Sequence, residues 1–328
     1  MAASTKDSNA SKINGAIDIT KLIMAILVIG IHTEPFGFHF WLDKGFAICT
    51  RLCVPFFFVA SAYFFWRKEK SPTVFLQRIA TLYVVWSIIY LPSDIPALGQ
   101  MTVPEILRRF LWTGNVHALW YLCGSIIGFI ITAILLKFLK PRYVLIIGFV
   151  ILVIGTAKST YSVAIYERFG VDLPNHLGPR NGLFYGFPYI ALGMAIAKSN
   201  AQGIYKRKIG LYAGLILSLL LLAAESYLFT IRFKAASTIL WLSVFPYTYF
   251  FFEIVLNKKV LIDQSVSLFF RKMSTLMYVS HSLFVPALRK FSANMSLFIL
   301  AVLCSAGFSI LVIKLSEKNR LRFLQYLY

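Results

Sequence analysis

Four ionisable side chains lie in or beside the first apolar run of the chain, IDITKLIMAILVIGIHTEPF: Asp18, Lys21, His32 and Glu34. An ionisable group inside an apolar run of membrane-spanning length is costly, so it is a functional candidate. Lys21 and His32 are eleven positions apart. On an α-helix this spacing puts them within roughly 20° of each other around the axis and about 16 Å apart along it. The run thus predicts a helix with a cation near one end and an imidazole on the same face near the other.

The imidazole of His32 is suited to proton transfer, because histidine titrates near neutral pH. Two structural alternatives stay open at the level of sequence. A lone histidine on a membrane helix can simply hydrogen-bond a neighbouring helix. Lys21 can extend to the membrane interface and pair with Asp18, three residues earlier.

Further ionisable candidates lie in later apolar runs. Arg51 opens the run TRLCVPFFF, and Arg78 lies early in the next one. Each of these arginines is suited either to binding an anion or to pairing with an acid on an adjacent helix. Glu225 lies near the end of a later run, and we interpret Glu253 and His281 as structural.

Two segments that precede apolar runs carry polar and aromatic side chains. HALWYL contains His117, Trp120 and Tyr121, and GPRNGLFYGFPYIALG contains Arg180 and Asn181. Tryptophan and tyrosine commonly form a belt at the membrane interface, which is the structural explanation for the first segment. An Arg-Asn pair followed by glycine is less usual there, and we expect it to contact a polar acceptor.

The composition excludes a soluble domain. Hydrophobic residues make up 59% of the 328 residues and charged residues only 14%, against about 25% charged residues in soluble proteins. The net charge of +20 comes from short basic clusters between apolar runs. This pattern is typical of cytoplasmic loops and not of a nucleic-acid-binding face. The four cysteines lie in apolar runs without a CxxC pair or a histidine cluster, so no metal site is expected.

We therefore expect an all-α, polytopic integral membrane protein with about ten transmembrane helices and both termini in the cytoplasm. Residues 1–14 would be a mobile polar N-terminus, 15–316 the transmembrane domain and 317–328 a short basic cytoplasmic tail. The start lacks the features of a signal peptide, so the first run is expected to be retained. The stretch Val103 to Trp112 is short and amphipathic and would lie along the membrane surface. The expected spans are 15–33, 46–66, 74–97, 118–138, 142–160, 181–199, 207–228, 237–257, 266–288 and 294–316.

These residues resemble the integral-membrane acyltransferase family 3. The family signature is a basic residue, ten further residues and a histidine, which Lys21 and His32 match, with Asp18 as the preceding acid. RLCVPFFFVASAYFF, LWYL, RNGLFYGFPYIALG and MYVSHSLF resemble later family segments, so the resemblance covers nearly the whole chain. Many members carry arginine at the position of Lys21. Lysine keeps the charge but lacks the planar fork that binds phosphate through two hydrogen bonds.

The resemblance implies transfer of an acyl group, which we expect to be acetyl, from cytoplasmic acyl-CoA to a sugar or other small polar hydroxyl acceptor at or beyond the plasma membrane. Acetyl-CoA would be a co-substrate, no cofactor would be bound permanently, and membrane lipid would surround this multi-pass protein. His32 would be the general base, with Glu34 orienting its imidazole if the helix continues that far. Lys21 and Arg78 would bind the CoA phosphates. The substrate-binding residues would be Arg51, Trp120, Tyr121, Arg180 and Asn181.

The second apolar run also resembles the membrane half of vancomycin-resistance serine racemases, which is associated with supplying serine. The alternative function is therefore binding or uptake of L-serine through the same intramembrane polar residues. A membrane scaffold without an activity of its own is a third possibility. The sequence leaves open whether the chain is a complete acyltransferase or the membrane half of a fusion.

Overall fold

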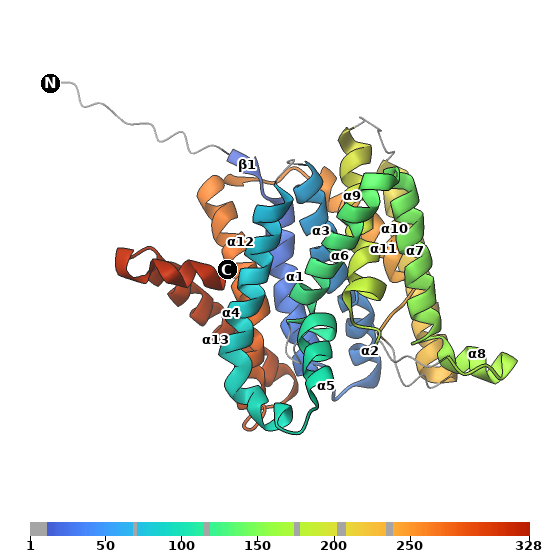
Figure 1. The fold of residues 1–328 in the computed structure, drawn as a ribbon, viewed down its shortest axis with the longest axis horizontal. Helices are drawn as coiled ribbons and strands as arrows, with labels where there is room; N and C mark the ends of the chain where they lie inside the picture. The colour runs from blue at the N-terminus through green and yellow to red at the C-terminus, as the bar shows by residue number, and fades with distance from the viewer. Residues whose placement is uncertain (1–11, 68–70, 115–118, 174–177, 202–207, 234–238) are drawn as a thin grey trace.

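The computed structural model describes residues 12–67, 71–114, 119–173, 178–201, 208–233 and 239–328. Long helices run alongside one another, with β1 at one end of the bundle and the short helices α5 and α8 at the other (Figure 1). The elements in chain order are β1 (Lys12–Asn14), α1 (Ala16–Thr33), α2 (Phe40–Thr50), α3 (Cys53–Arg67), α4 (Pro72–Leu98), α5 (Val103–Arg108), η1 (Arg109–Thr113), α6 (Trp120–Phe138), α7 (Pro141–Ala157), α8 (Ser162–Phe169), η2 (Gly182–Gly186), α9 (Phe187–Ala201), α10 (Lys208–Tyr227), η3 (Leu228–Arg232), α11 (Val244–Asn257), β2 (Leu261–Asp263), α12 (Gln264–Leu288), α13 (Asn294–Ser316) and η4 (Asn319–Leu327).

Each of the ten predicted spans contains a helix, but not every helix is of spanning length and apolarity. Six helical stretches among the described residues are long and apolar enough to cross a membrane, or seven if the bent pair α7 and α8 is one span. α9 and α11, at 15 and 14 residues, are short for a crossing, and α12 is long but too polar. The structure is thus nearly all helical, with six or seven candidate membrane spans over its described residues, whereas the number ten and the cytoplasmic placement of both termini stay predictions. The six stretches are Ala16–Thr33, Phe40–Arg67, Pro72–Leu98, Trp120–Phe138, Ile209–Arg232 and Asn294–Ser316.

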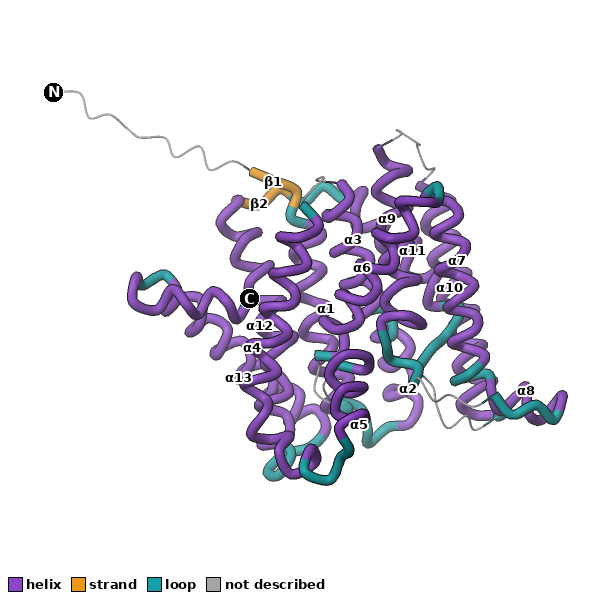
Figure 2. Tube along the Cα trace, viewed as in Figure 1, coloured by secondary structure: helices purple, strands orange, loops and turns teal. Residues whose placement is uncertain are grey.

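A small β-ladder, which the sequence did not predict, joins the start of the chain to its last third. β1 pairs antiparallel with β2, with Ile13 opposite Ile262, and the pair lies at one end of the bundle (Figure 2). The Asn14 side-chain amide also donates to the Lys258 carbonyl at 2.8 Å. Strand is confined to this pair within the part of the chain that the structure describes. Because α1 follows β1 and α12 follows β2, the ladder sets these two helices side by side.

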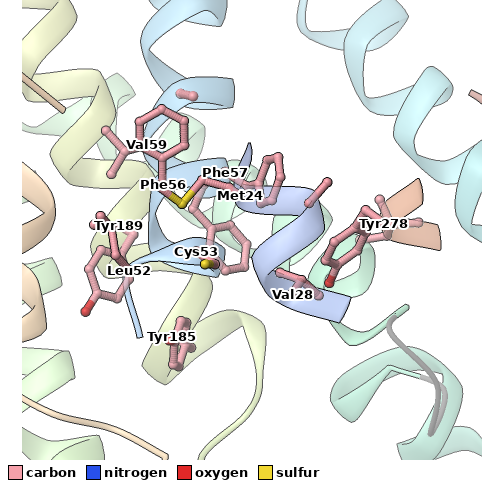
Figure 3. Packing of buried hydrophobic residues seen from close by; sticks show 14 of the residues in the cluster. Met24, Val28, Leu52, Cys53, Phe56, Phe57, Val59, Tyr185, Tyr189 and Tyr278 are labelled. Carbon is pink, nitrogen blue, oxygen red and sulfur yellow. The ribbon is translucent and has the colours of Figure 1, made fainter. Parts of the chain in front are cut away.

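The core is aromatic and depends on close approach of small residues. Phe56 of α3 is fully buried, as is Tyr189 of α9 apart from 1% of its surface (Figure 3). Phe58 of α3 is also fully buried. A Cβ at Gly193 of α9 would lie 2.4 Å from the carbonyl oxygen of Val59 of α3. Glycine therefore lets the two backbones touch, as is usual where membrane helices pack closely. This contact places α3 firmly against α9.

The stretch expected to lie along the membrane surface is helical, as α5 and η1. Thr102 and Glu105 form a capping box, with the Thr102 backbone N–H donating to the Glu105 carboxylate at 2.8 Å. This backbone hydrogen bond, with that from the Thr102 hydroxyl, lowers the pKa of Glu105. The buried Arg109 guanidinium donates to Asp94 of α4 at 2.9 Å. The ion pair fastens η1 to the end of α4.

Candidate functional site

A cavity of about 360 Å³ lies between α1, α3, α4, α6 and α12, with Tyr328 at one wall. Lys21 of α1 and Arg78 of α4 both line it, so the structure brings together the two residues predicted to bind CoA phosphates. Arg271 and Lys272 of α12 line the same cavity. Four cations from three helices therefore surround one space.

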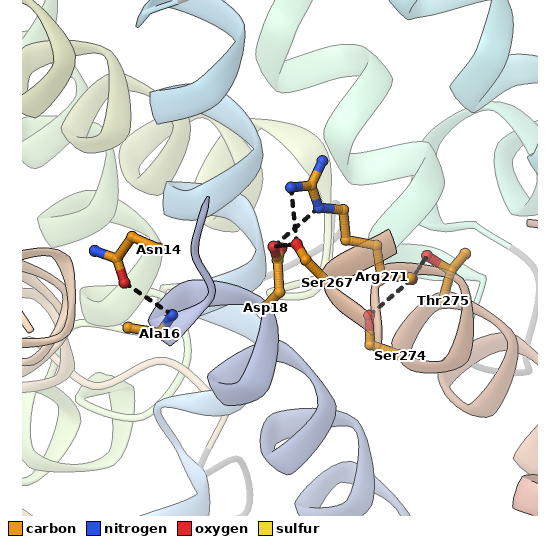
Figure 4. A network of polar contacts seen from close by, with 7 residues as sticks. All are labelled: Asn14, Ala16, Asp18, Ser267, Arg271, Ser274 and Thr275. Carbon is orange, nitrogen blue, oxygen red and sulfur yellow. Dashed lines mark hydrogen bonds and ion pairs between the residues drawn. The ribbon is translucent and has the colours of Figure 1, made fainter. Parts of the chain in front are cut away.

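The acid in this cavity is already neutralised by one of its cations. The Asp18 carboxylate accepts hydrogen bonds from Arg271 Nε at 3.0 Å and from the Ser267 hydroxyl (Figure 4). Asp18 is almost entirely buried, whereas 44% of the Arg271 side chain is exposed. Counting side chains of the lining, four cations against one carboxylate leave a formal charge of +3. Such a cavity favours an anionic ligand with several charges.

Much of the rest of the wall is aromatic. Lys21 Nζ lies 5.3 Å from the centroid of the Phe64 ring, and Lys272 Nζ lies 5.1 Å from that of Tyr328. The Tyr121 hydroxyl lies 3.2 Å from the Ser61 hydroxyl. The cavity therefore suits a ligand that combines negative charge with flat or apolar groups. Its aromatic lining residues are Phe57, Phe64, Phe65, Phe75, Tyr121, Tyr278 and Tyr328.

His32 does not line this cavity but is linked to it through two residues of α12. The Tyr278 ring, on the cavity wall, lies 6.1 Å from the His281 ring, which lies 5.0 Å from the His32 ring. Arg289, at the end of α12, donates to the His32 backbone carbonyl. His32 thus faces α12, and Lys21 lines a cavity of which α12 forms one wall. His32 itself is exposed near the end of α1.

The role predicted for Glu34 depended on continuation of the helix, and the helix does not continue. α1 ends at Thr33, and Glu34 adopts a left-handed conformation with φ of 51°. The following Pro35 disfavours a further helical turn, and a left-handed residue is a common way to end a helix. The Glu34 side chain is exposed.

The residues predicted to bind the acceptor are not gathered in one place. Tyr121 lines the cationic cavity, whereas the Trp120 ring packs edge-on against Tyr185, 5.3 Å away. The Arg51 guanidinium lies 5.7 Å from the Trp241 ring, beside a second pocket of about 50 Å³. Arg180 lies close enough to both Arg51 and His32 to act on them electrostatically. Arg180, Arg51 and His32 therefore share one region, at the end of α1 remote from Lys21.

Two polar candidates have structural roles as helix caps. The buried Asn181 side chain accepts from the backbone N–H groups of Leu183 and Phe184 at 2.9 and 2.8 Å, and so caps η2. The Glu225 carboxylate accepts from the backbone N–H groups of Leu242 and Ser243 ahead of α11. Unpaired N–H groups at a helix start explain both residues. His117 lies outside the described residues.

Sequence reasoning missed Arg271 and Lys272. Both lie within the predicted span 266–288, so their charge inside an apolar run was the signal that could have found them. His281 was interpreted as structural, and its neighbour His32 lies on a different helix. Nothing in the sequence indicates which two helices are adjacent.

The structure thus combines apolar helices of spanning length with a cavity that four cationic side chains line. The family profile described as an acyltransferase domain matches residues 14–315, and the chain belongs to this family, acyltransferase family 3. The chain is 28% identical over 217 residues to an amino-acid racemase of Enterococcus faecalis, covering 60% of this chain and 30% of the relative. It is 24% identical over 265 residues to a serine/alanine racemase of Enterococcus gallinarum, covering 74% of this chain and 37% of the relative.

The chain thus spans about a third of the length of these curated relatives. No solved structure matches it significantly.

Proposed function

We propose that this protein transfers an acyl group, preferentially acetyl, from a coenzyme A thioester to a hydroxyl acceptor. The observation that carries the proposal is the cationic, aromatic-walled cavity in a chain of acyltransferase family 3. Coenzyme A combines three phosphate groups with a flat adenine ring, so it is the kind of ligand such a lining favours. The phosphates would be bound by Lys21, Arg78, Arg271 and Lys272.

The donor would enter from the cytoplasm. The basic clusters around the α6–α7 connection and ahead of β2 support this orientation, because basic loops remain on the cytoplasmic side. They contribute Lys137, Lys140, Arg142, Lys258 and Lys259. In this orientation Lys21 lies toward the cytoplasmic end of α1 and His32 toward the outer end. The protein would be a multi-pass protein of the plasma membrane.

His32 would be the general base. The acceptor hydroxyl gives its proton to the imidazole while its oxygen attacks the thioester carbonyl carbon. The carbon–sulfur bond then breaks, and the thiolate of coenzyme A leaves and takes up a proton. Lys21 and His32 are separated by about 16 Å along α1, and the long pantetheine arm of coenzyme A suits that separation. The exposed position of His32 leaves room for an acceptor from the outer side.

Binding or uptake of L-serine is the second candidate, and the names of the racemase relatives favour it. In that case Arg51 or Arg180 would bind the serine carboxylate at the outer end of the bundle. His32 would then shape a polar site and transfer no proton.

Calorimetric titration of the purified protein with acetyl-CoA and, separately, with L-serine distinguishes the two candidates. We expect heat of binding with acetyl-CoA. Heat with serine and none with acetyl-CoA would refute the acyltransferase proposal.

A further inference from the structure

His281 is a fully buried histidine that the chemistry above does not use. It lies on α12, between the cavity wall at Tyr278 and the outer-end residue His32. The ring centroids of His281 and His32 are 5.0 Å apart, with the ring planes tilted by 34°. Arg289, at the C-terminal end of α12, donates from its guanidinium to the His32 backbone carbonyl and so holds the end of α1 against α12. This hydrogen bond helps to keep the two imidazoles side by side.

The hydrogen bond of His281 fixes which of its nitrogens carries the proton. Nδ1 lies 2.6 Å from the backbone carbonyl oxygen of Tyr278. A carbonyl oxygen can only accept, so Nδ1 must donate. In the neutral imidazole Nε2 is then an acceptor. This tautomer is the one that a histidine needs in order to receive a hydrogen bond from a neighbouring imidazolium.

We propose that His281 is the positioning partner of His32. It orients the His32 ring and accepts at Nε2 a hydrogen bond from the imidazolium that forms when His32 removes the acceptor proton. The inference rests on the proposed acyl transfer. The acceptor oxygen forms the new ester bond, the carbon–sulfur bond breaks with its electron pair on sulfur, and the proton on His32 passes to that thiolate. His281 only stabilises the charged state in between, so it exchanges no atom with the substrates.

Among the described residues, the other charged and titratable groups that act on His32 or Tyr278 do not change charge near neutral pH. They are two arginines and four tyrosines, whose ordinary pKa values lie well above neutral pH. A pH effect between about pH 5 and 8 that depends on residue 281 therefore reports the histidine pair. These groups are Arg180 ahead of η2, Tyr185 in η2, Tyr278 on α12, Arg289 at the C-terminal end of α12, Tyr90 on α4 and Tyr121 on α6.

Two substitutions separate a structural role from a positioning role. His281→Asn keeps a side-chain N–H near the position of Nδ1 and can still donate to the Tyr278 carbonyl, much as Asn257 donates to the Glu253 carbonyl at 2.7 Å. It removes the acceptor at Nε2. His281→Gln places an amide oxygen near the position of Nε2 and restores an acceptor. Ser280→Ala, at the fully buried neighbouring position, is the matched control.

We expect the steady-state kinetics of acetyl transfer to distinguish the variants. His281→Asn should lower kcat about tenfold to a hundredfold and shift the acid limb of the kcat–pH profile, with the KM for acetyl-CoA unchanged. This loss is smaller than the 10²–10⁴-fold contribution typical of a general base itself. His281→Gln should recover part of the rate, and Ser280→Ala should match the wild type. A His281→Asn enzyme with wild-type kcat and pH profile would overturn the proposal.

A second measurement makes the inference independent of the transfer assay. The rate of His32 modification by diethyl pyrocarbonate, followed by peptide mass spectrometry, gives a curve against pH. Removing a partner that stabilises the imidazolium should move the midpoint of this curve to lower pH in His281→Asn but not in Ser280→Ala. Coincident curves would overturn the positioning role even if the wild type transfers acetyl groups. A shifted curve in a protein that transfers none would uphold the histidine pair and refute only the acyltransferase function.

Discussion

Adding a single methyl group at Gly193 should loosen the core of the bundle. A Cβ there would lie 2.4 Å from the Val59 carbonyl oxygen and 2.8 Å from the Ala62 Cβ, whereas ordinary contact begins at 3.4 Å. α3 and α9 must therefore separate by about 1 Å at this point. Overpacking of this kind costs about 1–3 kcal/mol, and the obstacle here is backbone that cannot rotate away. Alanine regains about 1 kcal/mol of helix propensity over glycine, which leaves Gly193→Ala less stable by up to about 2 kcal/mol.

Gly307 of α13 supplies the matched control, because a Cβ there meets nothing within 4 Å. Gly307→Ala should be as stable as the wild type, or more stable by up to about 1 kcal/mol. The assay is the thermal midpoint of each purified variant in the same detergent, read by tryptophan fluorescence and by the monodisperse fraction that remains after heating. If Gly193→Ala melts together with Gly307→Ala, then α3 and α9 are not in backbone contact and the packing described for the core is wrong.

Four further outcomes are expected. Lys21→Ala should weaken acetyl-CoA binding about tenfold to a hundredfold, since a charge-assisted hydrogen bond contributes about 1.5–3 kcal/mol; an unchanged calorimetric Kd would leave Lys21 an interfacial residue. His32→Gln should assemble and bind acetyl-CoA but lose nearly all transfer, because an amide accepts no proton near pH 7; retained turnover would remove its role as base. Asp94→Ala should destabilise the protein by about 3–5 kcal/mol in thermal melts by removing the carboxylate that pairs with a buried guanidinium; an unchanged melt would mean that this ion pair contributes little to stability. Reporter fusions after Lys208 and Tyr328 should both give a cytoplasmic signal, and an external signal at either would contradict the orientation.

Much of the architecture was readable from the sequence, because apolar length and helical periodicity are local properties. The period of 3.6 residues predicts that Lys21 and His32 share a face of α1; in the structure Lys21 lines a cavity partly walled by α12, and His32 contacts His281 of α12. Arg78 lines the same cavity as Lys21, and its role in binding CoA stays a prediction. These predictions needed only the position of a residue within its own helix.

Features that depend on neighbouring segments were not readable. Arg271 joins the cavity because the pairing of β1 with β2 sets α12 beside α1, and three-residue strands give almost no sequence signal. Glu34 was assigned by extending a helix that ends one residue before it. Asn181 has the polarity expected of an acceptor-binding residue. Its amide oxygen instead accepts hydrogen bonds from two backbone N–H groups of η2. In each case a long-range contact or a helix end decides the role.

The ion pair between Asp18 and Arg271 also affects the order of events while the chain is synthesised and inserted. The two residues are 253 positions apart, and a ribosome adds about 5–20 residues per second. Asp18 and Lys21 therefore enter the bilayer with the first helix roughly 13–50 s before Arg271 is even synthesised. During that interval the first helix must keep a carboxylate and an ammonium near the membrane surface without the partner on α12. The cavity therefore forms late in biogenesis. Any delay late in translation prolongs the exposure of Asp18 and Lys21.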